Sequence, residues 1–394
     1  MRFLSRHQFN NYLDKLARPE VRVLRRSLSS YQVCGVTGLF LAILLVMTLV
    51  INLGLSLLIM SVIVLTAVFI LLGMAMITKI ITGNEKLIYY HHQIVVIVAT
   101  IVLLRLLHCF ILPYLDITIL GVGVFLFCGR IGCFMVGCCH GRPHRWGTCY
   151  HEKHAFTGFP PYFVGVRLFP VQILESILIF LIISVSTILV FRGYASGEAF
   201  VWHVIAYGIG RFFFEFIRGD PGRPYLWGFS EAQWTSLILM SIVVSLEFRG
   251  ALPFHLWHVV VTAGMIPAML FVFIIRQLSK IPKYQLLHPR HMREVSEAIE
   301  PVSGPAFKKT IVFKQDSPFP IIVGHTSLGI QISTSKIQGK EREIDHYAFS
   351  SKNETMSKEA ALTLANLIVQ LKHPYQLKEF ITGKNGIFHL LIHS

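Results

Sequence analysis

Residues 36–77 read VTGLFLAILLVMTLVINLGLSLLIMSVIVLTAVFILLGMAMI and lie within the longest uncharged stretch of the chain. No Asp, Glu, Lys or Arg occurs between Arg26 and Lys79. A helix needs about 20 apolar residues to cross the hydrocarbon core of a bilayer. The stretch is therefore long enough for two transmembrane helices, with Asn52 and Gly54 at the turn between them.

The rest of the chain has the composition of a membrane protein. Its 394 residues are 54% hydrophobic and 14% charged, with a mean hydropathy of +0.60, whereas a soluble domain is about 25% charged. Further apolar runs occupy residues 93–111, 117–136, 171–191, 199–217, 234–247 and 254–275. We therefore predict an α-helical polytopic membrane protein with seven or eight transmembrane helices.

Changes in composition divide the chain into four parts. We expect a basic amphipathic segment over residues 1–30, a transmembrane domain over 31–277, a polar linker over 278–305 and a soluble module over 306–394. In the module, runs such as KTIVFK and EIDHYAFS are rich in β-branched and apolar residues, as strands are. The apolar residues of 364–371 recur at the spacing of one helix face. The module is thus predicted to be a small α+β domain.

The formal net charge of +15 at neutral pH has two interpretations. A strongly basic chain can bind nucleic acid, but no recognised nucleic-acid motif accompanies the charge. Lys and Arg also collect on cytoplasmic loops and beside the anionic headgroups that surround membrane proteins. We therefore expect contacts with membrane lipids and no nucleic-acid partner.

Polar residues gather on one face of the run YGIGRFFFEFIRGDPGRP, residues 207–224. The four that recur at i, i+4, i+8 and i+11, and so lie on one side of a helix, are Tyr207, Arg211, Glu215 and Arg218. Charge within a membrane is costly and faces a polar cavity or another charge. Because guanidinium grips phosphate with a planar fork, we predict a substrate cavity here. An ion pair that only tethers two helices is the alternative.

The run FPVQILES, residues 169–176, adds two polar side chains at the start of an apolar segment. Gln172 and Glu175 are i, i+3 neighbours on a helix. We expect both to face the same cavity as the polar stripe; a solvated helix end is the other interpretation of Gln172.

The loop GRIGCFMVGCCHGRPHRWG, residues 129–147, begins where an apolar run ends. Its glycines allow close backbone approach, and backbone amides together with Arg130 would hold an anion. We therefore predict a lipid-phosphate site at the membrane interface.

Two other interpretations of this loop remain. One is a metal site, for which sulfur and nitrogen donors are abundant: Cys133, Cys138, Cys139, His140, His144, Cys149, His151 and His154. The other is a tight loop in which Cys133 and Cys138 only fill space. Because the C-x-x-C spacing of structural zinc sites is missing, we predict no metal and no cofactor.

Three blocks, in this order along the chain, resemble the prolipoprotein diacylglyceryl transferase family. GRIGCFMVGCCHG is similar to the family signature G-R-x-G-N-F-x-N-x-E-x-x-G, and PVQILE is similar to P-x-Q-L-Y-E. YGIGRFFFEFIRGDP resembles Y-G-x-x-R-F-x-x-E-F-x-R-x-P-D. The likeness covers roughly residues 31–250 and leaves the last apolar run and the soluble module outside.

The resemblance implies a multi-pass transferase of the bacterial cytoplasmic (inner) membrane. Such an enzyme moves the diacylglyceryl group of phosphatidylglycerol to the thiol of a lipobox cysteine in a preprolipoprotein. Arg130 and Arg211 would hold the departing phosphate, and Glu215 would orient Arg211. The residues that would contact the substrate or shape its cavity are Tyr207, Gly141, Gln172, Glu175 and Arg218.

The chain departs from the family pattern at two places. Cys133 and Cys138 replace the Asn and Glu of the signature. The family's histidine, about forty residues before the signature arginine, corresponds by ungapped counting to Tyr90 within LIYYHHQ, with His91 one step away. A general base works best with a pKa near the operating pH, which suits histidine. We therefore name Tyr90 and His91 as candidate catalytic residues; an aromatic belt at the membrane interface is the alternative.

Two other classes of function use the same features. An anion or lipid transporter would pass its cargo along the polar stripe, and a non-catalytic anchor or sensor would present the C-terminal module. The basic segments at both ends favour a cytoplasmic location for the termini, whereas the resemblance implies a site that opens to the outer side of the membrane.

Overall fold

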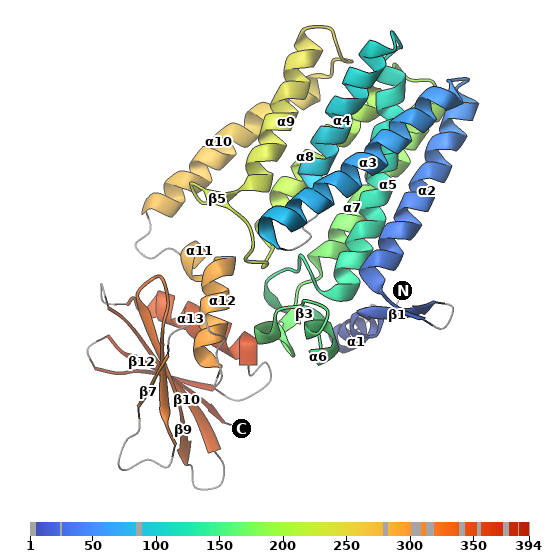
Figure 1. Cartoon of the computed structure of the whole chain (residues 1–394). Helices are drawn as coiled ribbons and strands as arrows, with labels where there is room; N and C mark the ends of the chain where they lie inside the picture. The colour runs from blue at the N-terminus through green and yellow to red at the C-terminus, as the bar shows by residue number, and fades with distance from the viewer. Residues whose placement is uncertain are drawn as a thin grey trace.

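The computed structural model describes residues 5–23, 26–83, 89–278, 283–300, 309–312, 319–338, 343–352, 356–372, 378–384 and 386–393. Most of residues 30–278 form a helical bundle, and the C-terminal residues form a separate β-rich module at one end of it (Figure 1). This arrangement confirms the predicted class, an α-helical polytopic membrane protein with a small C-terminal α+β domain.

Among the described residues, five helices of the bundle are long and apolar enough to cross a membrane. They are α2 (Ser30–Asn52), α3 (Leu57–Thr82), α5 (Leu112–Val136), α7 (Val171–Phe191) and α10 (Leu256–Leu278). Three shorter or more polar helices pack beside them: α4 (Tyr89–Leu106), α8 (Glu198–Phe214) and α9 (Glu231–Phe248) (Figure 1). The apolar run of 36–77 thus forms two antiparallel helices, α2 and α3, with a turn at Gly54, as expected.

Helix α5 is the centre of the bundle and contacts α2, α7 and α8. Small residues let its backbone approach α2 closely, as in other membrane helix pairs. A Cβ on Gly38 would lie 2.7 Å from Cys128 Cβ, and one on Gly121 would lie 2.7 Å from Val46 Cγ2. The helix ends at Gly137, whose φ of 84° turns the chain back toward the bundle.

The segment between α5 and α7 and the one between α8 and α9 fold over one end of the bundle. The first contains β3 (Pro143–Cys149), α6 (Glu152–Ala155), the 3₁₀ helix η1 (Pro161–Phe163) and β4 (Arg167–Leu168). The second contains β5 (Tyr225–Leu226) and β6 (Phe229–Ser230).

The N-terminal segment lies against β3 at this same end (Figure 1). It forms α1 (Arg6–Leu16) and a hairpin of β1 (Glu20–Val23) and β2 (Arg26–Ser29). Asp14 of α1 pairs with Arg167 at 2.9 Å, and Asn10 accepts a hydrogen bond from the Gly147 amide at 3.0 Å.

The C-terminal module is a six-stranded antiparallel sheet with helices packed on it. The strands are β7 (Lys309–Val312), β8 (Ile321–His325), β9 (Ile330–Gln338), β10 (Glu343–Ser351), β11 (Lys378–Thr382) and β12 (Phe388–His393), in the spatial order β11-β12-β10-β9-β8-β7. Helix α13 (Lys358–Lys372) buries the predicted apolar face of 364–371. Of these strands, β11 was not expected from the sequence.

Within the segment that we expected to be a polar linker, residues 278–305, the structure describes Leu278 and residues 283–300. They contain α11 (Lys283–Leu286) and α12 (Pro289–Ile299). Met292, Val295 and Ile299 lie on one face of α12 and are buried in the core that also holds α13 and the sheet. The sequence of this segment resembles a linker because α12 is an amphipathic helix. Most of its residues are polar, and a narrow apolar stripe on one face packs into the core.

The same core continues into the bundle. Phe134, Tyr150 and Phe163 belong to it together with Leu13 of α1 and residues of α12 and α13. The module, the N-terminal segment and the end of α5 therefore form one packed region, and both ends of the chain lie at the same end of the bundle (Figure 1).

Candidate functional site

A buried carboxylate, Glu175 of α7, joins the arginines of two other helices. Its side chain is completely inaccessible to solvent. Arg130 of α5 places Nε 3.0 Å from Glu175 Oε1, and Arg211 of α8 places Nε 3.9 Å from the same oxygen. The two guanidinium groups from separate helices therefore converge, as the sequence motifs predicted.

Two more side chains complete the surroundings of Glu175. The hydroxyl of Tyr207 donates to Oε1 at 2.9 Å, and Arg218 places Nη1 3.4 Å from Oε2. Arg218 lies beyond the end of α8, whereas the periodicity placed it on the helix itself. It still reaches the cluster because the turn after Phe214 continues the same side of the helix.

Two more carboxylates, Glu215 and Asp220, contact the arginines of this cluster. Glu215 Oε1 is 2.7 Å from Arg211 Nη2 and 2.5 Å from Arg223 Nη1. Asp220 pairs with Arg218 Nε at 2.8 Å and with Arg223 Nε at 3.0 Å. Burial disfavours the charged form of Asp220, but Arg218 and Arg223 outweigh it and hold the pKa of this carboxyl well below its usual range.

The cluster carries one more positive charge than negative. It has four guanidinium groups, Arg130, Arg211, Arg218 and Arg223, against the carboxylates Glu175, Glu215 and Asp220. Arg211 Nη1 is buried and has no hydrogen-bond partner within the part of the chain that the structure describes. An uncompensated buried cation is costly, so the cluster is suited to bind one monoanion.

A cavity of about 900 Å³ reaches this cluster. Apolar residues of three helices line most of it: Leu39, Ile43, Met60, Ile63, Val68, Val122, Phe125 and Leu126 among them. Arg130, Arg211, Asp220 and Arg223 line its charged end. The cavity is therefore amphipathic, with a charged end and mostly apolar walls.

Tyr90 and His91 are placed differently. Tyr90 lines the cavity, and its hydroxyl is 2.7 Å from Ser236 Oγ. His91 turns to Glu231, with 2.6 Å between Nε2 and Oε1, and its side chain is 44% exposed. The next residue, His92, also lines the cavity. We did not expect it from the sequence, and the spacing along α4 supplied no signal that separates it from His91.

Gly141 and Gln172 shape the loop behind the cavity. The Gly141 amide donates to Phe169 O at 2.9 Å, and a Cβ at this position would lie 2.6 Å from that oxygen. Gln172 donates from Nε2 to Cys138 O at 2.8 Å. Both hold the backbone that follows α5.

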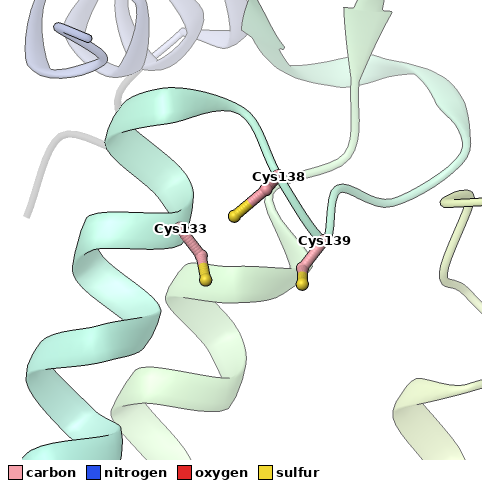
Figure 2. Close-up of side chains that lie close together, drawn as sticks. All are labelled: Cys133, Cys138 and Cys139. Atoms are coloured by element: carbon pink, nitrogen blue, oxygen red, sulfur yellow. The ribbon is translucent and has the colours of Figure 1, made fainter. Parts of the chain in front are cut away.

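Three of the donors considered for a metal site come together after α5. The Sγ atoms of Cys133, Cys138 and Cys139 lie within 4.8 Å of one another (Figure 2). His140, next in the chain, donates from Nδ1 to Gly141 O at 2.8 Å, and burial lowers its pKa. His144, Cys149, His151 and His154 do not belong to this sulfur group in the described part of the chain.

The fold and the site define an integral membrane protein whose helices surround a mostly apolar cavity with an arginine-rich end. The chain belongs to the prolipoprotein diacylglyceryl transferase family, whose sequence model matches residues 21–249. The match agrees with the extent predicted from the three blocks and excludes α10 and the C-terminal module.

Curated relatives have the same family name. The chain is 36% identical over 132 residues to the phosphatidylglycerol–prolipoprotein diacylglyceryl transferase of Clostridium tetani. The aligned region covers 34% of this chain and 51% of the relative. It is also 32% identical over 133 residues to the phosphatidylglycerol–prolipoprotein diacylglyceryl transferase 2 of Clostridium perfringens. This alignment covers 33% of this chain and 49% of the relative. The chain thus spans about half the length of the curated relatives that it matches.

Proposed function

We propose that the chain transfers the diacylglyceryl group of phosphatidylglycerol to the thiol of a lipobox cysteine in a preprolipoprotein, within the bacterial cytoplasmic membrane. Family membership supports the reaction class, and the names of the relatives supply the substrates. The observation that carries the proposal is the amphipathic cavity, whose charged end is formed by Arg130 and Arg211.

A phospholipid fits the chemistry of this cavity. The walls from α2, α3 and α5 offer apolar surface to acyl chains. The phosphodiester has one negative charge, which equals the excess positive charge of the arginine–carboxylate cluster. Arg130 and Arg211 would neutralise the phosphate as it becomes a leaving group, and Glu215 would keep Arg211 oriented.

The other predicted site residues have supporting roles in this proposal. Glu175 positions both arginines, and Tyr207 and Arg218 position Glu175. Gly141 and Gln172 hold the loop that closes the cavity. For the acceptor's proton, the candidates that line the cavity are Tyr90 and His92, whereas His91 would act only through Glu231.

Transfer is tested with the purified full chain, radiolabelled phosphatidylglycerol and a lipobox peptide. We expect a labelled thioether product, and Arg130→Gln should lower kcat by about 100-fold or more, the usual cost of losing a donor to a developing negative charge. Arg192→Gln, an exposed arginine at the end of α7, is the matched control and should retain activity.

Failure of the wild-type chain to form thioether would contradict the proposal. Uptake of labelled anion into vesicles without product would instead favour a transporter. The absence of both reactions would favour an anchor for the C-terminal module.

A further inference from the structure

The cysteines that replace the family's polar residues are arranged as a ligand set. Cys133 lies in the last turn of α5, and Cys138 and Cys139 follow the turn at Gly137. Their three Sγ atoms lie within 4.8 Å of one another and come from one continuous turn of chain (Figure 2). Tetrahedral zinc has Zn–S distances of about 2.3 Å, which places its sulfur ligands about 3.8 Å apart. Small rotations of the cysteine side chains would bring the Sγ atoms from their present separations, of up to 4.8 Å, to this spacing.

The backbone is shaped to bring these sulfurs together. Cys139 has a φ of 57°, a left-handed conformation that is uncommon and costly for a residue with a side chain. The loop is held by the bond from Gln172 to Cys138 O and by the bond from the Gly219 amide to His140 O at 2.9 Å. Ligands held in advance by their surroundings are typical of functional metal sites.

All three cysteines also line the cavity that reaches Arg130 and Arg211. Soft thiolate ligands select zinc or copper(I) rather than magnesium or calcium. A zinc ion with three protein ligands retains a fourth position for a substrate, whereas a structural zinc ion has four protein ligands. Among the described residues, the sulfur group supplies three ligand atoms, which is the ligand number of a reactive site, and its open position would face the cavity.

We propose that Cys133, Cys138 and Cys139 form a trithiolate site for Zn²⁺ whose fourth position binds the thiolate of the acceptor cysteine. This assignment rests on the proposed function. Binding of the acceptor thiol to the ion releases its proton to water. The sulfur then attacks the carbon of the diacylglyceryl group that carries the phosphate oxygen: the S–C bond forms, the C–O bond between that carbon and the phosphate oxygen breaks, and its electron pair leaves on glycerol phosphate. The neutral thioether is a weaker ligand than a thiolate and dissociates.

This site would explain two departures of the chain from its family. The signature loses its Asn and Glu at the positions where Cys133 and Cys138 provide sulfur. The position of the family's histidine holds Tyr90, and a zinc-bound thiol loses its proton without a general base. In this proposal, the cysteines that replace the Asn and Glu of the signature compensate for the loss of the histidine at the position of Tyr90.

The test uses the reduced full chain in phosphatidylglycerol-free nanodiscs and Co²⁺ as a spectroscopic probe. We expect one Co²⁺ per chain with thiolate-to-metal charge-transfer absorption, which Zn²⁺ displaces. Cys133→Ser, Cys138→Ser or Cys139→Ser should each weaken binding at least tenfold. Cys149→Ser and Cys109→Ser are controls that remove a cysteine outside the group and should bind as the wild type does.

The acceptor is added in a second step. A lipobox peptide should change the Co²⁺ spectrum, and the same peptide with Ser in place of its Cys should not. Because a Cys→Ser variant could misfold, the wild-type chain is also labelled with maleimide: Zn²⁺ should protect three thiols, counted by mass spectrometry.

Absence of stoichiometric metal binding to the reduced chain, or absence of thiol protection by Zn²⁺, would overturn the site. Metal binding with no response to the cysteine peptide would overturn the role of the fourth position. Metal and peptide binding without thioether formation from phosphatidylglycerol would support the site and contradict the proposed transfer, so the two failures are distinguishable.

Discussion

Glu175 pairs with three of the four arginines of the cluster. It contacts Arg130, Arg211 and Arg218 through its two oxygens and is completely buried. Glu175→Gln would leave these cations short of one negative charge, and breaking a buried pair costs about 3–5 kcal/mol. We expect a loss of that size in the free energy of unfolding, measured by denaturation in detergent micelles.

A matched variant is Glu231→Gln. Glu231 pairs with His91, but its side chain is 37% exposed, and exposed pairs contribute at most about 1 kcal/mol. Equal effects of the two substitutions would show that Glu175 is not the centre of the network.

Gly141 has a steric reason to be glycine. A Cβ there would lie 2.6 Å from Phe169 O and 3.2 Å from Ile217 O, both backbone atoms that cannot rotate away. Gly141→Ala should therefore displace the loop, cost about 1–3 kcal/mol and lower transfer activity. Gly35→Ala, where nothing lies within 4 Å of the added carbon, should change neither stability nor activity; loss of activity in this control would remove the steric explanation.

At the residue scale, the sequence predicted the charged part of the site better than the sulfur part. Helical periodicity and the cost of buried charge sufficed to place Arg211 and Glu215 together. The convergence of the cysteines depends on left-handed dihedrals at Gly137 and Cys139. Spacing rules such as C-x-x-C do not describe a turn of that kind, so the sequence alone did not indicate that the three sulfur atoms lie close together.

At the scale of the element, α12 begins with an unusual cap. His288 Nδ1 accepts a hydrogen bond from the Arg290 amide at 3.3 Å, and its ring packs on Tyr225. Burial and the nearby Arg290 lower the pKa of His288 to about 4, from a usual value of about 6.5. A protonated imidazole has no acceptor atom, so the cap requires the neutral form.

The sign of the resulting pH dependence follows from linkage. Between about pH 6.5 and pH 4 the unfolded chain binds a proton at His288 that the folded chain does not. Stability is therefore complete above pH 6.5 and falls as the pH is lowered toward 4. His288→Asn keeps a good capping residue that does not titrate. The hydrogen-exchange protection factors of the α12 amides should therefore depend less on pH in this variant. The same pH dependence in both chains would assign it to another group, such as the buried His291.

Helix α12 also shows where element prediction failed. Long apolar helices were predicted because a membrane span needs a continuous run. Met292, Val295 and Ile299 form an apolar stripe that is too narrow to be recognised in the polar sequence of 278–305. These three residues are buried because they pack into the core that also contains α13.

At the scale of the molecule, the bundle places α1, the C-terminal module and the segment between α5 and α7 at one end (Figure 1). We expect Cys149, in that segment, and a cysteine added at the C-terminus to react from the same side of the membrane. Labelling of single-cysteine variants with impermeant maleimide, in intact cells and in inverted vesicles, measures this. Labelling from opposite sides would contradict the arrangement of the bundle.

We propose that Arg130 and Arg211 bind the phosphate of a phospholipid within the cavity. The most direct test is to titrate the purified full chain with phosphatidylglycerol and to measure binding by native mass spectrometry. A hydrogen bond to a charged group is worth about 1.5–3 kcal/mol, so Arg211→Gln should weaken binding by about tenfold or more while Arg192→Gln binds as the wild type does. Binding of phosphatidylglycerol by the folded Arg211→Gln and Arg130→Gln chains with wild-type affinity would contradict the claim.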